Sequence, residues 1–155
     1  MRPVTRIHAA SGIAAIVIIS LFWAATVTSE LALGWNAVVA VKTMVLTGIP
    51  FLIAAMATAG LTGARLAGTS SASVIVRKRR RMMIIALNGL FVLVPSAVFL
   101  AWKAHAGLPD IGFYTVQVLE LVAGAVNVSL LVANARDGRR MTAKRRQAHA
   151  RPAAA

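Results

Sequence analysis

Four long apolar runs constrain this sequence more than any other feature. They cover residues 7–28, 37–60, 82–104 and 111–135. Each is long enough to cross a hydrocarbon core about 30 Å thick as a helix of roughly 20 residues. A water-soluble chain of 155 residues with 59% hydrophobic content would leave much of that surface in water. The sequence therefore predicts an all-α integral membrane protein, a four-helix bundle over residues 1–135.

The basic residues indicate the orientation of the chain. With four crossings, all but two of the 17 lysines and arginines fall on one side of the membrane. The exceptions are Lys42, inside the second run, and Lys103, at the end of the third. The positive-inside bias places the basic side in the cytoplasm, together with both termini. We therefore expect a multi-pass protein of the cell inner (cytoplasmic) membrane, with a basic, disordered cytoplasmic tail over residues 136–155.

Aromatic residues favour the same orientation. Under this topology the tryptophans and the single tyrosine are expected at the outer boundary, where such side chains gather in membrane proteins; they are Trp23, Trp35, Trp102 and Tyr114. Prolines inside the second and third runs, Pro50 and Pro95, predict kinks.

A basic cluster directly precedes the third run. It consists of Arg77, Lys78, Arg79, Arg80 and Arg81. Basic side chains at this position gain about 1 kcal/mol each from anionic lipid. The net charge of +13 would fit nucleic acid if it lay on a soluble face. Because the cluster adjoins a span, we expect a bilayer with anionic headgroups as its partner and no nucleic-acid partner.

Two polar stripes predict the interior of the bundle. The stripe in the fourth run recurs at spacings of three and four residues and consists of Gln117, Glu120, Gly124, Asn127, Leu131 and Asn134. Lipid offers polar groups no partner, so this stripe should face other helices or water. The third run has a stripe of the same spacing, formed by Asn88, Phe91, Pro95, Val98, Trp102 and His105. We expect the amides of Asn88 and Asn127, at similar depths, to hydrogen-bond directly or through water, a contact worth about 0.6 kcal/mol.

The ionisable residues Lys42 and Glu120 lie inside predicted spans, with Gln117 one helical turn from Glu120. From the helical rise, the two charged groups differ in depth by roughly 4–5 Å, which a lysine side chain can bridge. Intramembrane ionisable residues are costly and often functional. These three residues form the predicted intramembrane polar site, suited to a proton relay, a ligand counter-ion or a quinone contact. Alternatively, Lys42 extends outward to the interface and Glu120 stays protonated as an interhelical contact.

Histidine and methionine near the inner boundary suggest a cofactor contact. His8 matches Met82 and Met83 in depth, so one of these pairs could ligate a b-type haem. His105 lies at the outer boundary and His149 in the tail, so neither can share a haem with His8.

The stretch Thr5-Arg6-Ile7-His8-Ala9-Ala10-Ser11-Gly12 resembles the Ser-x-x-His-Arg-x-Ser-Gly segment of succinate dehydrogenase cytochrome b membrane anchors. In that family the serine and arginine help to bind quinone, so the resemblance implies quinone contact near His8 and Ser11. It covers eight residues. Ala9 stands where the family has arginine, and the second run has no histidine to match the family's haem ligand.

No catalytic set is visible. Cysteine is absent, and three of the four acidic residues, Glu30, Asp110 and Asp137, lie outside the runs. No zinc or phosphate-binding signature is present, so we expect no metal site and no soluble-type hydrolytic enzyme. The leading prediction is a non-catalytic accessory or helper component that packs with a membrane-protein partner or a second copy of itself. The alternatives are a membrane redox protein contacting quinone or haem and, third, an oligomeric small transporter or proton pathway.

Overall fold

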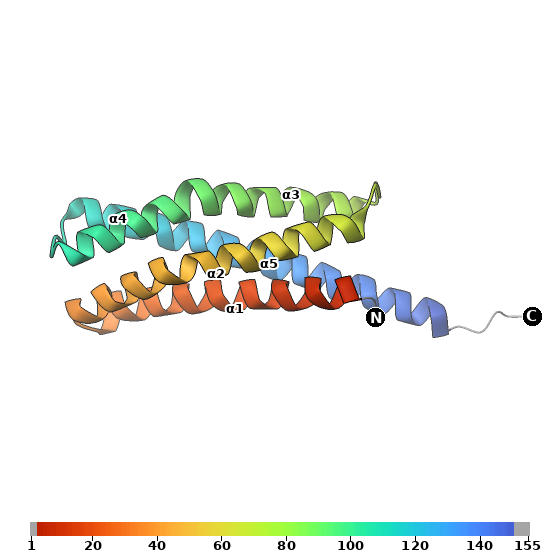
Figure 1. Ribbon diagram of the computed structural model, residues 1–155, viewed down its shortest axis with the longest axis horizontal. Helices are drawn as coiled ribbons and strands as arrows, with labels where there is room; N and C mark the ends of the chain where they lie inside the picture. The colour runs from red at the N-terminus through yellow and green to blue at the C-terminus, as the bar shows by residue number, and fades with distance from the viewer. Residues whose placement is uncertain (1–2, 151–155) are drawn as a thin grey trace, which may run out of the picture.

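Helices account for nearly the whole described part of the chain, residues 3–150 of the computed structural model (Figure 1). The elements are α1 (Pro3–Ala32), α2 (Trp35–Ala67), α3 (Ser73–Asn88), η1 (Gly89–Leu93), α4 (Val94–His105) and α5 (Ile111–Ala150). Because α3, η1 and α4 follow one another without a break, they form one long helix, Ser73–His105, which is the third candidate span. The four resulting helices are long and apolar enough to cross a membrane. The predicted all-α, four-helix architecture is confirmed.

The helices extend beyond the apolar runs. α2 continues to Ala67, and α3 begins at Ser73, so that it includes the whole basic cluster. α5 continues to Ala150, so the tail is helical over 136–150, where the sequence predicts disorder. Residues 1–2 and 151–155, and the side chains of 144–146 and 148–150, lie outside the described residues.

The bundle has two unlike ends. The α1–α2 and α4–α5 turns lie together at one end, which we call the hairpin end (Figure 1). The α2–α3 loop lies at the other end with the start of α1 and the C-terminal part of α5. We call this the basic end, because the cluster at 77–81 and Arg136, Arg139 and Arg140 of α5 are there.

Each helix packs against particular neighbours. α1 and α2 form a long hairpin, α5 packs against α1, α3 and α4, and α2 packs against α4 while barely touching α3. Among the described residues α2 and α5 are therefore diagonal to one another. An apolar cluster closes the hairpin end and contains Val38, Leu100, Ala104 and Phe113. A second cluster, with Ile19, Ile85 and Leu131 at its centre, lies closer to the basic end.

A π-helical turn overturns the interior stripe predicted for the third span. Pro95 cannot donate a backbone hydrogen bond, and its ring would clash with the carbonyl four residues earlier in a regular helix. The wider turn of η1 lies directly before it and adds a residue to the helical repeat. The buried face therefore moves by one position, to Ser96, Ala97, Leu100, Ala101 and Ala104. The predicted residues Phe91, Pro95, Val98, Trp102 and His105 are exposed, and of that stripe only Asn88 faces inward.

Trp23 is also placed differently from the prediction. α1 runs to Ala32, four residues beyond the predicted span, so Trp23 lies well before its end. Its indole Nε1 donates to the backbone oxygen of Leu121 at 3.0 Å, beside Gly124 in α5. Trp23 is therefore an interhelical contact. Trp35, Trp102 and Tyr114 do lie at the hairpin end, where Trp35 packs on Phe113.

The α4–α5 turn is held by Asp110. Its Oδ1 accepts from the amide of Phe113 at 2.9 Å, as an N-cap of α5 does, and its other oxygen accepts from Lys103. The Lys103 hydrogen bond, and then the Phe113 amide, lower the pKa of the Asp110 carboxyl. The cap is therefore ionised at neutral pH. Gly107, at φ 67°, supplies the left-handed residue that this turn requires.

Candidate site in the bundle interior

Lys42 and Glu120 meet inside the bundle. The Lys42 Nζ donates to Glu120 Oε2 at 2.8 Å. The lysine side chain is 1% exposed and the glutamate side chain 12%. The lysine therefore points inward, and it does not extend to the bundle surface.

This ion pair spans the diagonal of the bundle. α2 and α5 have no close backbone contact in the described residues, so side chains link them: Trp35 packs on Phe113 at the hairpin end, and Lys42 reaches Glu120 further inside. Taking two charges out of water costs several kcal/mol per ion, which their attraction only partly offsets. A buried ion pair is therefore weak evidence for stability. The position of Lys42 and Glu120 inside the bundle favours a role in binding.

Two further polar side chains belong to the same region, Gln117 and Glu30. The Gln117 Nε2 lies 3.5 Å from Glu120 Oε2, and its Oε1 is buried with no hydrogen-bond partner. Glu30, on α1, is close enough to interact electrostatically with both Lys42 and Glu120, and its Oε1 is also buried without a partner. We call Glu30, Lys42, Gln117 and Glu120 the interior polar cluster.

The sequence pointed to three members of this cluster but missed Glu30. The apolar run predicts that the first span ends at residue 28, which places Glu30 in the connection to the second span. The signal for a longer helix was present, because Leu31 and Ala32 continue the apolar run past Glu30. Thr26 and Ser29 are buried on the same helix, and Thr26 lies three residues from Trp23 and four from Glu30.

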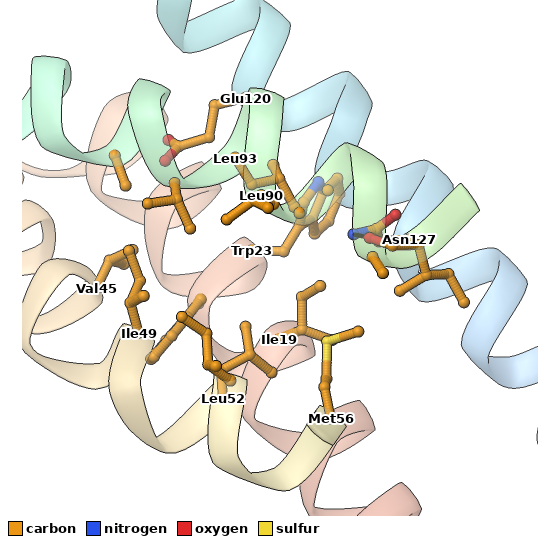
Figure 2. A pocket seen from close by; sticks show the side chains of 18 of the residues that line it. Ile19, Trp23, Val45, Ile49, Leu52, Met56, Leu90, Leu93, Glu120 and Asn127 are labelled. Carbon is orange, nitrogen blue, oxygen red and sulfur yellow. Dashed lines mark hydrogen bonds between the residues drawn. The ribbon is translucent and has the colours of Figure 1, made fainter. Parts of the chain in front are cut away.

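A cavity begins where the interior polar cluster ends (Figure 2). Its volume is about 680 Å³, and residues of all four spans line it. In α5 the order along the helix is Phe113 in the closed hairpin end, then Gln117 and Glu120, then Gly124 and Asn127 in the cavity wall. The interior polar cluster therefore lies between the apolar core of the hairpin end and the apolar cavity.

The cavity walls are almost entirely apolar. Figure 2 shows Val45, Ile49, Leu52 and Met56 of α2 on one side of the cavity, with the third span and α5 across from them. Glu120, at the edge of the site in Figure 2, is the one ionisable residue in the described lining.

The cavity is open between α2 and α3. Lining residues on the facing sides of these helices are also exposed at the bundle surface, namely Ile53, Leu61, Met83 and Leu90. α2 and α3 barely touch, so no helix closes this side. An apolar molecule could enter sideways without passing either end of the bundle.

Asn88 and Asn127 form a second polar contact on the cavity wall. The Asn88 Nδ2 donates to Asn127 Oδ1 at 2.8 Å and to the backbone oxygen of Ala123 at 2.9 Å. The Asn127 Nδ2 donates to the backbone oxygen of Ile85 at 3.3 Å. These bonds tie α3 to α5 and satisfy most of the polar atoms of both amides.

The residues considered for haem or quinone contact are not gathered at one point. His8 faces α2, where its Nδ1 lies 3.0 Å from the backbone oxygen of Ala59 and its ring packs on Gly63. The Ser11 hydroxyl donates within its own helix, to the oxygen of Ile7 at 2.8 Å. Met82 and Met83 line the cavity, whereas His8 and Ser11 do not. Among the side chains that the structure describes, no group of three His, Asp or Glu residues is placed to hold a metal ion.

The basic cluster is partly engaged with the bundle. The Arg81 Nη1 donates to Asp137 Oδ2 at 2.8 Å, Arg77 approaches the same oxygen at 3.8 Å, and Arg79 donates to the backbone oxygen of Gly68. Arg77, Arg79 and Arg80 remain exposed. The cluster therefore fastens α3 to α5 and still presents charge at the basic end.

Comparison of the chain with protein-family models, with curated proteins and with solved structures finds no match. The geometry of the interior polar cluster and its cavity is therefore the basis for a functional proposal.

Proposed function

We propose that this chain is a multi-pass membrane protein of the cell inner membrane, with both termini in the cytoplasm. Four helices of sufficient length and apolarity support insertion. The concentration of lysine and arginine at the basic end supports the orientation, because such residues favour the cytoplasmic side. Trp35, Trp102 and Tyr114 at the hairpin end fit an outer aromatic belt. The exposed arginines of the basic end would contact anionic headgroups.

Within the membrane the chain acts as a non-catalytic accessory component that binds an apolar, membrane-soluble molecule. The observation that carries this proposal is the cavity between the four spans, open between α2 and α3. Its volume of about 680 Å³ lies within the range of ligand pockets, about 300–1,000 Å³, and its apolar walls are typical of such sites. The opening faces the hydrocarbon region, so the ligand enters from the bilayer.

Filling the cavity should abolish binding without unfolding the bundle. Gly60 lines the cavity, and an added Cβ there meets no atom within 4 Å. We expect Gly60→Phe to place its ring in the cavity and to lower affinity for an apolar probe at least tenfold. Gly12→Phe is the matched control, because Gly12 also has open space around it but lies outside the lining.

The probe is a brominated dodecanol, whose bromine quenches tryptophan fluorescence. Trp35→Phe and Trp102→Phe leave Trp23, in the cavity wall, as the single reporter. Saturable quenching in lipid nanodiscs, lost in Gly60→Phe and kept in Gly12→Phe, supports the proposal. Equal quenching in both variants would mean that the alcohol reaches Trp23 only through bulk lipid, and would reject it.

A further inference from the structure

The interior polar cluster carries unbalanced charge at the end of an apolar cavity. It holds two carboxyl groups, Glu30 and Glu120, against one ammonium, Lys42. The charged groups of α4 are engaged elsewhere in the described structure: Lys103 binds Asp110, and His105 lies 2.9 Å from the Thr43 hydroxyl. The η1 segment has no ionisable side chain. Fully ionised, the cluster therefore has a formal charge of −1.

Two acceptor atoms of the same cluster have no hydrogen-bond donor. Gln117 is 3% exposed, its amide nitrogen points toward Glu120, and its Oε1 has no partner. Glu30 Oε1 is also buried without a hydrogen-bond partner. A buried acceptor without a donor is destabilising. The excess negative charge favours a positively charged group, and Glu120 is the member of the cluster that such a group would meet in the cavity lining.

We propose that the cavity binds a single-chain amphiphile with a primary ammonium head group, which lies against Glu120 while its hydrocarbon chain occupies the apolar walls. This inference rests on the proposed function and specifies its ligand class. Glu120 is reachable from the cavity, since it is part of the lining. The volume suits one chain and is small for a two-chain phospholipid.

Ammonium binding is coupled to release of a proton. In the empty site, an uncompensated buried charge is costly, so the cluster takes up one proton, and the resulting O–H supplies a donor. The ligand arrives already protonated, R–NH₃⁺, and its positive charge replaces that proton, which leaves to bulk water. One proton is lost for each ligand bound, and the charge of the site is unchanged.

Three probes with the same hydrocarbon chain separate the contributions of charge and of N–H donors to binding: dodecylammonium, dodecyltrimethylammonium and dodecanol. Each is titrated against nanodiscs containing the protein with Trp23 as its single tryptophan. We expect dodecylammonium to bind at least tenfold more tightly than dodecanol, with dodecyltrimethylammonium between them, because it has the charge but no N–H. Affinity for dodecylammonium should rise with pH by up to about tenfold per unit while one proton is displaced.

Glu30→Gln tests the charge of the cluster and leaves the Lys42–Glu120 ion pair in place. We expect it to remove the preference for dodecylammonium and the pH dependence, while dodecanol binding is unchanged. Asp137→Asn, which removes a carboxyl at the basic end, is the control. It should keep both the preference for dodecylammonium and the pH dependence. Glu120→Gln should behave like Glu30→Gln where it folds, as judged by its circular dichroism.

The outcomes separate this inference from the proposed function. Equal affinities for dodecylammonium and dodecanol, both blocked by Gly60→Phe, would overturn the ammonium inference and leave an apolar binding protein. If neither probe binds, and the protein forms a dimer in which a second copy fills the opening between α2 and α3, both the ammonium inference and the proposed function are overturned.

Discussion

Replacing Lys42 by methionine is expected to lower the free energy of unfolding by about 3–5 kcal/mol. Methionine keeps much of the length of the side chain, so the loss comes from charge. Glu120 would remain in the interior, 12% exposed, without the ammonium that lies 2.8 Å from its Oε2. Removing one partner of a buried pair leaves an uncompensated charge. The measurement is equilibrium unfolding by dodecyl sulfate in mixed micelles.

The matched control for this variant is Lys103→Met. Lys103 also has a carboxylate partner, Asp110, but that partner is 48% exposed. A pair with an exposed partner contributes little, so the control should lose much less free energy of unfolding than Lys42→Met. The double variant Lys42→Met with Glu120→Gln should recover most of the stability, because no charge is left unpaired between these two positions. If Lys42→Met loses no more free energy of unfolding than Lys103→Met, the Lys42–Glu120 ion pair does not contribute to stability.

Asn127→Asp should destabilise the protein by a similar amount, about 3–5 kcal/mol at pH 7. The substitution changes almost no volume, so it isolates the effect of a negative charge. Asn127 is 1% exposed, and its nearest polar partners are the Asn88 amide and the backbone oxygen of Ile85. Neither carries a positive charge. The new carboxylate would also lose the donor that Nδ2 provides to Ile85.

This variant reports whether the cavity is dry. Asn127 is part of the cavity wall, so water in the cavity would solvate the new charge and remove most of the penalty. Asn36→Asp, at an exposed position near the start of α2, controls for the same chemical change and should cost less than about 0.5 kcal/mol. A loss in Asn127→Asp as small as in Asn36→Asp would contradict a dry, apolar cavity.

Much of the architecture follows from local pattern. Apolar length alone predicts the four spans, because a helix of roughly 20 residues is needed to cross lipid. Comparing depths along ideal helices was also sufficient to suggest that Lys42 could reach Glu120, and Asn88 could reach Asn127. Both pairs are in contact, at 2.8 Å each. Depth is predictable in this way because the rise per residue hardly varies.

Helical phase is less predictable than depth. The π-helical turn at Gly89–Leu93 adds one residue and rotates everything after it, so a stripe extrapolated from Asn88 ends on the outside at Trp102. Proline indicated a disturbance in the third span, but its type depends on how the span packs. Glu30 was missed for a related reason, because the end of α1 is set by packing as well as by composition.

The cavity could not be predicted from sequence either. Its residues are ordinary apolar side chains, the same types that fill a close-packed core. Whether they meet depends on the separation of α2 from α3, which no local pattern encodes. The sequence signal that did point toward the site was the cost of placing Lys42 and Glu120 inside spans.

Cysteine labelling in sealed spheroplasts tests the central claim most directly, since the chain has no cysteine of its own. Four single substitutions report the two ends of the bundle: Leu33→Cys and Leu108→Cys at the hairpin end, Ser71→Cys and Thr142→Cys at the basic end. A membrane-impermeant maleimide should label the first two in sealed spheroplasts and the last two only after the membrane is opened. Labelling of the basic-end positions before opening, or of all four alike, would contradict a four-span protein with a cytoplasmic basic end.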